Sequence, residues 1–476
     1  MSNIKKNFMY NTIYQILIII LPLILTPYIS RVMGAEKLGI YSYSYSISSC
    51  FALICLLGVS EYGNRSIARV RGNKQELNKT FWSIYFMQLI TSIVSIALYI
   101  VFVLVFINKN KSIFMIQIIY VFSFMIDFNW LFCGLEQFKL TVFRNILVKI
   151  SSFCCILLFV KSSNDIHIYA LIMSLSALIS QLICIPYIKR YIGFCKVSIS
   201  DIIKHIKPNL KLFIPVMSFA IFKMMDKVML GYMSSMAQVG YYENVMKVID
   251  LPMGLITALG VVMLPRISNM VANGDSEQSL VYLRKSMNFA MFMGCAISFG
   301  IASISDIFTP IFFGDEFTVC ISLLRWSAPI VIFKSWENVI KTQYLMPNCQ
   351  DNVYIKSSVI GAILNLLSNL ILIPIYGALG AIISSLIGQI SMCMYQNIHI
   401  HNKVKLLYYM KDSIIYLVFG SIMFSLVFIV GNILGTSITT LAIQIIVGVV
   451  SYCILVLLYF MLRKKELLVK LKEISN

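Results

Sequence analysis

The chain consists of long apolar runs separated by short polar connections, and this pattern decides what it can fold into. About 20 apolar residues span a bilayer as a helix, and runs of that length recur along the 476 residues. Only 12% of the residues are charged and 59% are hydrophobic, whereas about 25% of the residues of a soluble domain are charged. The sequence therefore predicts an all-α integral membrane protein.

Run length predicts about fourteen transmembrane helices. They are expected at roughly residues 8–31, 38–60, 80–107, 112–134, 141–161, 166–188, 210–232, 238–264, 286–312, 318–341, 354–374, 378–399, 412–431 and 438–462. The first run is too long for a signal-peptide core and no small-x-small cleavage site follows it, so we expect it to remain as a spanning helix. The connections leave no room for a separate soluble domain.

The distribution of basic residues predicts the orientation of the chain. The net charge is +19, but most Lys and Arg fall in short connections on one side of the membrane, notably 65–79, 189–211 and 463–472. This bias is the positive-inside pattern, and it accounts for the charge without a nucleic-acid partner. Both termini are therefore expected in the cytoplasm. Residues 193–211 are either an interfacial segment against anionic lipid or a helix that joins two halves.

The chain also resembles itself. "GIY" at 39–41, "LGV" at 57–59, Arg65 and Gly72 are matched by "GYY" at 240–242, "LGV" at 259–261, Arg266 and Gly274. Six helices separate the copies, so both start on the cytoplasmic side and are parallel repeats. Secondary transporters are often built from such repeats, with substrate bound between the halves.

Three segments carry a family likeness, and the first is the most specific: "LPLILTPYISRVMGAEKLGIYSYSYSI" (21–47), "LGVSEYGNRSIARVRG" (57–72) and "DKVMLGYMSSMAQVGYYENVMKV" (226–248). They resemble the polysaccharide-transport family of Wzx-type lipid-linked oligosaccharide flippases, and "GLEQFK", "LPRIS" and "FGDEF" continue the likeness. The resemblance implies a MATE-like fold of the MOP superfamily: two six-helix bundles around a V-shaped cavity, with two further C-terminal helices.

The implied function is export of an undecaprenyl-pyrophosphate-linked oligosaccharide, such as an O-antigen or capsule repeat unit. The glycan would move from the inner to the outer leaflet of the bacterial cytoplasmic membrane by antiport of H⁺ or Na⁺. A polysaccharide polymerase and glycosyltransferases are the implied partners. The expected division is an N-terminal bundle (1–189), a cytoplasmic linker (190–209), a C-terminal bundle (210–402), and two helices with a basic tail (403–476).

Charged residues inside the predicted spans are the candidate site, because a charge near the bilayer centre costs ~2.5–3.5 kcal/mol and is seldom placed against lipid. One stripe consists of Lys223, Asp226 and Lys227, and the next span carries Glu243, Lys247 and Asp250 at i, i+4, i+7 spacing. The lysines are predicted to bind the pyrophosphate, and Asp226, Asp250 and Glu243 to bind the coupling ion. The alternative is helix–helix pairing, Asp226 with Lys247 or Lys227 with Glu243.

Two arginines complete the predicted cationic cavity. Arg325 is favoured over Lys334, since they point to opposite faces of one helix, and Lys334 is expected to pair with Glu337. Arg31 either meets headgroups or anchors the first helix at the outer surface. Asp127 lines the first bundle or bonds to a neighbouring helix.

Other classes of function fit the sequence less well. No phosphate-cradling glycine loop, catalytic triad or metal-ligand spacing appears, so no enzyme activity, cofactor or metal is predicted. The alternatives are a peptidoglycan-precursor (lipid II) flippase and a multidrug or organic-cation antiporter of the same fold.

Overall fold

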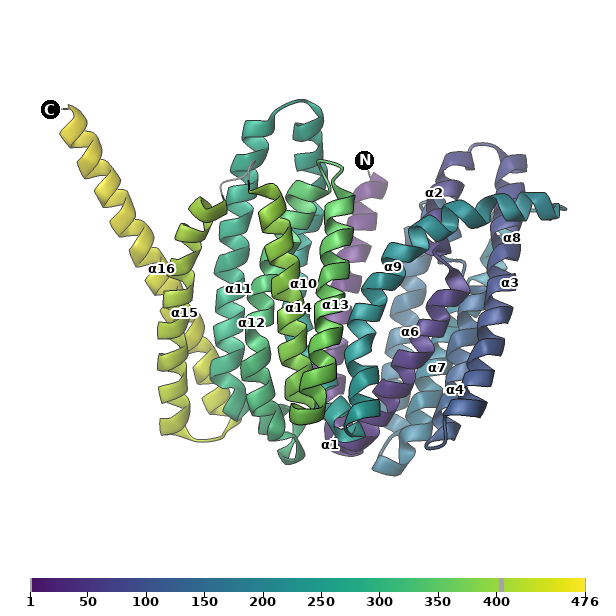
Figure 1. Ribbon diagram of the computed structural model, residues 1–476, viewed down its shortest axis with the longest axis horizontal. Coiled ribbons are helices and arrows are strands. Elements are labelled where there is room, and N and C mark those ends of the chain that lie inside the picture. The colour runs from purple at the N-terminus through teal and green to yellow at the C-terminus, as the bar shows by residue number, and fades with distance from the viewer. Residues whose placement is uncertain (1, 402–405, 476) are drawn as a thin grey trace. The chain divides into compact units, whose positions relative to one another are not determined.

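The computed structural model describes residues 2–401 and 406–475, and within these the chain is helical with no strand (Figure 1). By packing, it divides into two compact units, Met1–Gly240 and Tyr241–Asn476. The first unit contains α1 (Ser2–Leu56), α2 (Val59–Val70), α3 (Lys74–Phe106), α4 (Lys111–Ser123), η1 (Phe124–Ile126), α5 (Asn129–Gly134), α6 (Phe138–Phe159), η2 (Ser163–Asp165), α7 (Ile166–Leu182), α8 (Ile185–Tyr191) and α9 (Ile199–Met233).

The second unit is built almost wholly of long helices. It contains most of α10 (Met236–Ala272), α11 (Ser276–Phe313), η3 (Asp315–Phe317), α12 (Val319–Ile340), the π-helical turn η4 (Lys341–Leu345), α13 (Asp351–Tyr376), α14 (Ala378–Ile400), α15 (Leu406–Leu434) and α16 (Ile438–Ser475). The helix α9, assigned to the C-terminal bundle by the repeat, packs in the first unit against α1 and α3. The six-helix division at residues 209–210 stays a prediction.

The number of spans agrees with the number predicted from the sequence. Twelve segments of the described residues are long and apolar enough to cross a membrane. One of them, Ile20–Val70, contains two predicted helices, because α1 has a break at Gly34, where φ is 72°. Only glycine adopts such a conformation at little cost. With the two arms counted separately and α9 added, the total is fourteen.

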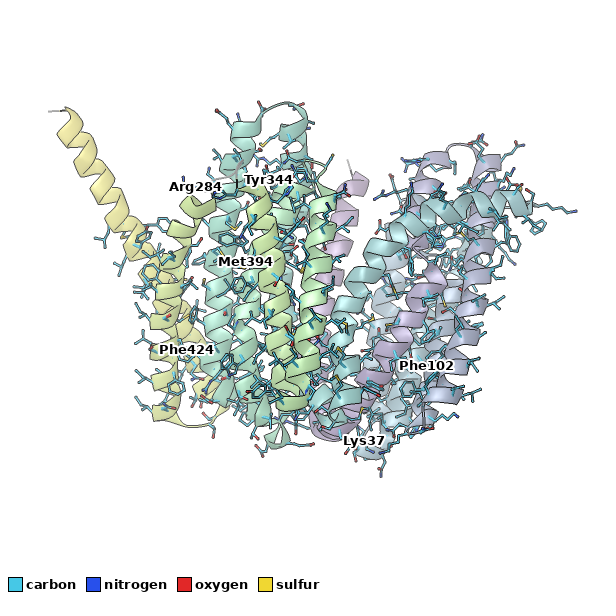
Figure 2. All side chains as sticks on the ribbon, in the orientation of Figure 1. Lys37, Phe102, Arg284, Tyr344, Met394 and Phe424 are labelled. Carbon is cyan, nitrogen blue, oxygen red and sulfur yellow. The ribbon has the colours of Figure 1, made fainter. Side chains whose placement is uncertain are left out.

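Apolar side chains cover the outer surface of the helices, as a lipid solvent requires. Met394, for example, is 60% exposed, and Figure 2 shows such side chains along the helices of each unit. The serines of α1 are buried instead. Ser46 and Ser48 each donate to the carbonyl four residues earlier, which satisfies their hydroxyl groups within the helix.

One predicted span is interrupted in the structure, and the segment before residue 210 is helical, which is compatible with both readings of residues 193–211. The span 112–134 is not one continuous helix, because it is interrupted between α4 and α5. There the side-chain amide of Gln88 donates to the carbonyls of Phe124 (2.8 Å) and Asp127 (3.1 Å). These bonds satisfy carbonyl groups that have no partner within the interrupted helix. The segment before residue 210 is helical from Ile199, since Ser198 and Asp201 form a capping box.

The repeated glycines mark a close approach of backbones inside the first unit. A Cβ atom on Gly39 would lie 1.6 Å from the carbonyl oxygen of Met236, and one on Gly240 would lie 2.0 Å from that of Ala35. Any side chain at either position would force the start of α10 away from α1. Close packing of this pair explains why glycine stands at both positions of the repeat.

Candidate functional site

The charged stripe on α9 lies in the first unit. Asp226 is buried, with 3% of its surface exposed, and Lys227 is half-buried. Both have interaction partners. The side chain of Lys223 lies outside the described residues. Arg31 is exposed and also has a partner, three residues before the break at Gly34.

The charged residues predicted in the second unit are held in local ion pairs. Lys247 lies 3.4 Å from the carboxylate of Glu243, one turn away on α10. The guanidinium of Arg325 pairs with Asp306 on α11. An anionic ligand would have to compete with these carboxylates for Lys247 and Arg325, so their binding role stays a prediction.

Asp250 has a partner for which the sequence analysis made no prediction. Its carboxylate accepts a hydrogen bond of 2.8 Å from Lys334 on α12. The predicted pair of Lys334 with Glu337 is therefore wrong for this conformation, in which Lys334 reaches across to α10 instead.

The first unit contains a polar cavity that the sequence reading did not identify. It has a volume of about 390 Å³ and lies among α4, η1, α5, α6 and α7. Arg144 on α6 is its central charged group, although only 2% of the residue is exposed. The remaining lining residues are Tyr120, Ser123, Phe124, Asn129, Cys133, Thr141, Asn145, Ala177, Ser180 and Gln181.

The guanidinium of Arg144 is held mainly by uncharged groups. It donates to the side chains of Asn129 (2.7 Å), Asn145 (2.8 Å), Gln181 (3.4 Å) and Cys184 (2.9 Å). No carboxylate lies within ion-pair distance of it among the described residues. The positive charge is therefore oriented but not directly neutralised.

The break between α4 and α5 positions this network. Asp127 accepts from the backbone N–H of Asn129 (2.8 Å) and so fixes the start of α5, while the indole of Trp130 donates to Gln88 (3.0 Å). Asn129 then presents its carbonyl oxygen to Arg144. No ion pair joins the Asp127 carboxylate to Arg144 among the described residues.

A second cavity of about 240 Å³ adjoins the first, and Tyr120, Asn145, Ala177 and Ser180 line both. It adds a second cation, Lys149, which follows Arg144 by five residues on α6. Its wall also carries the aromatic rings of Tyr41 and Tyr45. The ring of Tyr45 lies 5.0 Å from that of Tyr120, and their hydroxyls are 3.2 Å apart.

Together the two cavities are lined by groups that would bind an anionic ligand rich in hydroxyl groups. Arginine and lysine supply charge-assisted donors for phosphate or carboxylate, and the amides, serines and tyrosines supply donors and acceptors for hydroxyl groups. The sequence reading missed Arg144 because it lies near the cytoplasmic end of its predicted span, where basic residues are common. Its separation of five residues from Lys149 was the available signal.

The fold is that of an all-helical protein with many helices long and apolar enough to cross a membrane. The structure is similar to the lipid II flippase MurJ in its inward closed conformation, with a TM-score of 0.76 and 14% identity over 95% of this chain and 99% of that one. It is also similar to an inward-facing multidrug resistance MATE transporter, with a TM-score of 0.63 and 13% identity over 87% and 98% of the two chains.

The family of the protein follows from comparison of its sequence with protein families. Residues 4–271 match the model of the polysaccharide biosynthesis protein family, which covers more than half of the chain, and the protein belongs to that family. Its relatives include a "Putative O-antigen transporter" of Shigella dysenteriae, 23% identical over 79% of this chain and 94% of that protein. The resemblance noted in the sequence is thus confirmed at the level of the family.

Proposed function

We propose that this protein is a flippase that moves an undecaprenyl-pyrophosphate-linked oligosaccharide from the inner to the outer leaflet of the bacterial cytoplasmic membrane. Family membership and the O-antigen transporter relative support this class of substrate. The fold supports a transport mechanism of alternating access, the mode common to transporters built from repeats.

The polar cavity of the first unit carries the proposal. A buried guanidinium without a directly paired carboxylate is costly inside a membrane protein, and Arg144 is such a group, at the wall of a polar cavity. An anionic ligand would offset it. Arg144 and Lys149 are assigned to the pyrophosphate or to acidic sugars, and the neighbouring amides and hydroxyls to the glycan.

The remaining predicted residues extend this assignment. Lys223, Lys227, Lys247, Arg325 and Arg31 are proposed as further cationic contacts on the transport route, and Asp226, Asp250 and Glu243 as acidic groups that exchange with the substrate or bind the coupling ion. The coupling ion is proposed to be H⁺ or Na⁺. A polysaccharide polymerase and glycosyltransferases are the proposed partners in the same membrane.

Proteoliposomes test this function directly. The purified protein is reconstituted with undecaprenyl-pyrophosphate oligosaccharide, and the fraction accessible to an impermeant glycosidase is followed with time. Faster exposure than in protein-free vesicles is expected. Parallel vesicles carry lipid II or a fluorescent organic cation. Transport of the organic cation alone would contradict the proposal, and transport of lipid II alone would assign the protein to peptidoglycan export instead.

A further inference from the structure

The second unit contains a carboxyl group that the proposed site does not use. Glu337 lies on α12, and its Oε1 atom is shielded from solvent and has no hydrogen-bond partner among the described residues. No ammonium or guanidinium group of the described residues forms an ion pair with it. A negative charge there would be both desolvated and unpaired, which strongly favours the neutral acid.

The two lysines nearest to Glu337 along the chain are engaged elsewhere. Lys334 reaches to Asp250 on α10, at 2.8 Å. Lys341 donates to the hydroxyl of Tyr354 on α13, at 3.0 Å, and lies 4.3 Å from the centre of that ring. Either lysine could neutralise a carboxylate at Glu337 only after leaving its present partner. The charge state of Glu337 is thus linked to contacts that α12 makes with α10 and α13.

The neighbouring helix α14 supplies polar groups suited to a protonated acid. Gln396 is fully buried beside Glu337, and its amide nitrogen donates to Ser357 (2.9 Å). The carbonyl oxygen of Gln396 has no donor among the described residues. An acid and an amide form two complementary hydrogen bonds only when the acid carries its proton, so protonation would provide the donor that this oxygen lacks. The thiol of Cys393 on α14 is a titratable group within electrostatic reach of Glu337.

The local structure suits a site that changes state. The indole of Trp336 donates to Asn397 (3.0 Å), and the thiol of Cys393 donates to the carbonyl of Phe333 (3.1 Å), which together hold α14 against this turn of α12. Immediately afterwards the helix widens into the π-helical turn η4. Such turns occur often at functional sites, because they shift the register of the following residues.

We propose that Glu337 is a proton-binding site of the transport cycle, with Lys334 exchanging between Asp250 and Glu337 as the proton is bound and released. In the conformation described, Glu337 holds the proton and Lys334 pairs with Asp250. Release of the proton leaves a carboxylate that draws Lys334 away from α10. One proton is bound and one released per cycle, with no other reactant. This inference rests on the proposed flippase function and places its proton coupling in the second unit.

The main test uses Glu337→Gln, which keeps the shape and the hydrogen-bonding groups but cannot release a proton. Flipping of the undecaprenyl-pyrophosphate oligosaccharide is measured in proteoliposomes with and without an imposed proton gradient. Wild-type protein is expected to be accelerated several-fold by the gradient. The variant should show no acceleration by the gradient, because its side chain cannot release a proton. The exposed Glu277→Gln on α11 serves as the matched control and should behave as wild type.

Two outcomes would overturn the inference: acceleration of Glu337→Gln equal to that of wild type, or acceleration of the wild type by a sodium gradient but not by a proton gradient. A second measurement does not depend on flipping. Difference infrared spectra between neutral and alkaline pH should contain a protonated-carboxyl C=O band in the wild type that Glu337→Gln lacks. Absence of flipping by wild type would reject the proposed function, whereas absence of this band would reject the proton site.

Discussion

At the scale of single residues, the charges inside the membrane helices differ in what balances them. Arg325 has a carboxylate partner, Asp306, and its guanidinium also lies 5.6 Å from the ring of Phe428 on α15. Removal of one member of a partly buried pair leaves the other uncompensated. Asp306→Ala should therefore lower the free energy of unfolding by roughly 1–2 kcal/mol, discounted for the partial exposure of the pair. The double variant Asp306→Leu with Arg325→Met should recover most of it in thermal unfolding of the detergent-solubilised protein. A double variant as unstable as the single one would show that the pair is not the cause.

His205, near the start of α9, gives a prediction for pH. Burial and the positive charge of Lys204 lower the pKa of His205 to about 4, and its Nδ1 lies 2.6 Å from the hydroxyl of Tyr62. Since the unfolded chain takes up this proton at a higher pH, near 6.5, the unfolded state binds more protons between pH 6.5 and 4. The stabilisation by neutral His205 is thus complete above pH 6.5 and declines as the pH falls. Thermal midpoints measured from pH 7.5 to 5 should fall more for wild type than for His205→Gln. Parallel curves for the two proteins would contradict this.

At the scale of helices, the contact between α1 and the start of α10 depends on two glycines. Because a Cβ on Gly240 would meet the carbonyl of Ala35 at 2.0 Å, Gly240→Ala requires the helices to separate. We expect a loss of roughly 1–3 kcal/mol, typical of overpacking, seen as a lower thermal midpoint and a lower yield of monodisperse protein. Gly72→Ala is the matched control, since nothing lies within 4 Å of a Cβ there. Equal midpoints for Gly240→Ala and wild type would show that the helices adjust without cost.

The helices themselves were largely predictable, and their interruptions were not. Hydropathy fixes where a span lies, because the bilayer sets its length. Hydropathy does not reveal the break after α4. That break depends on Gln88 of α3, which donates hydrogen bonds to the carbonyls of Phe124 and Asp127. Charge periodicity places Asp250 and Lys247 on one face of α10, but the partner of Asp250 depends on which helix packs beside α10. Lys334 reaches Asp250 from α12, a contact that no sequence spacing reveals.

At the scale of the whole molecule, the orientation in the membrane is open to a direct test. In the first unit, α2, α8 and the start of α9 carry many basic residues and lie at one end, whereas the bend of α1, near Lys37, lies at the other (Figures 1 and 2). We predict that the basic end and both termini are cytoplasmic. In a chain whose own exposed cysteines are replaced, Lys109→Cys should react with an impermeant maleimide added outside intact cells. Gly72→Cys should react only after the membrane is opened. The reverse pattern would invert the orientation.

The charge of Arg144 is proposed to serve the substrate and not only the fold. The most direct measurement is the initial rate of oligosaccharide flipping in proteoliposomes for wild type, Arg144→Lys and Arg144→Gln, with the exposed Arg190→Gln as control. Lys149→Gln is included as a variant outside the Arg144 hydrogen-bond network. Each protein is first shown to be monodisperse and folded. We predict a loss of ten-fold or more for Arg144→Gln, a clear loss for Lys149→Gln, and partial retention for Arg144→Lys, which keeps the charge but loses the forked geometry. Wild-type rates for folded Arg144→Gln and Lys149→Gln would contradict the assignment of this cavity to the substrate.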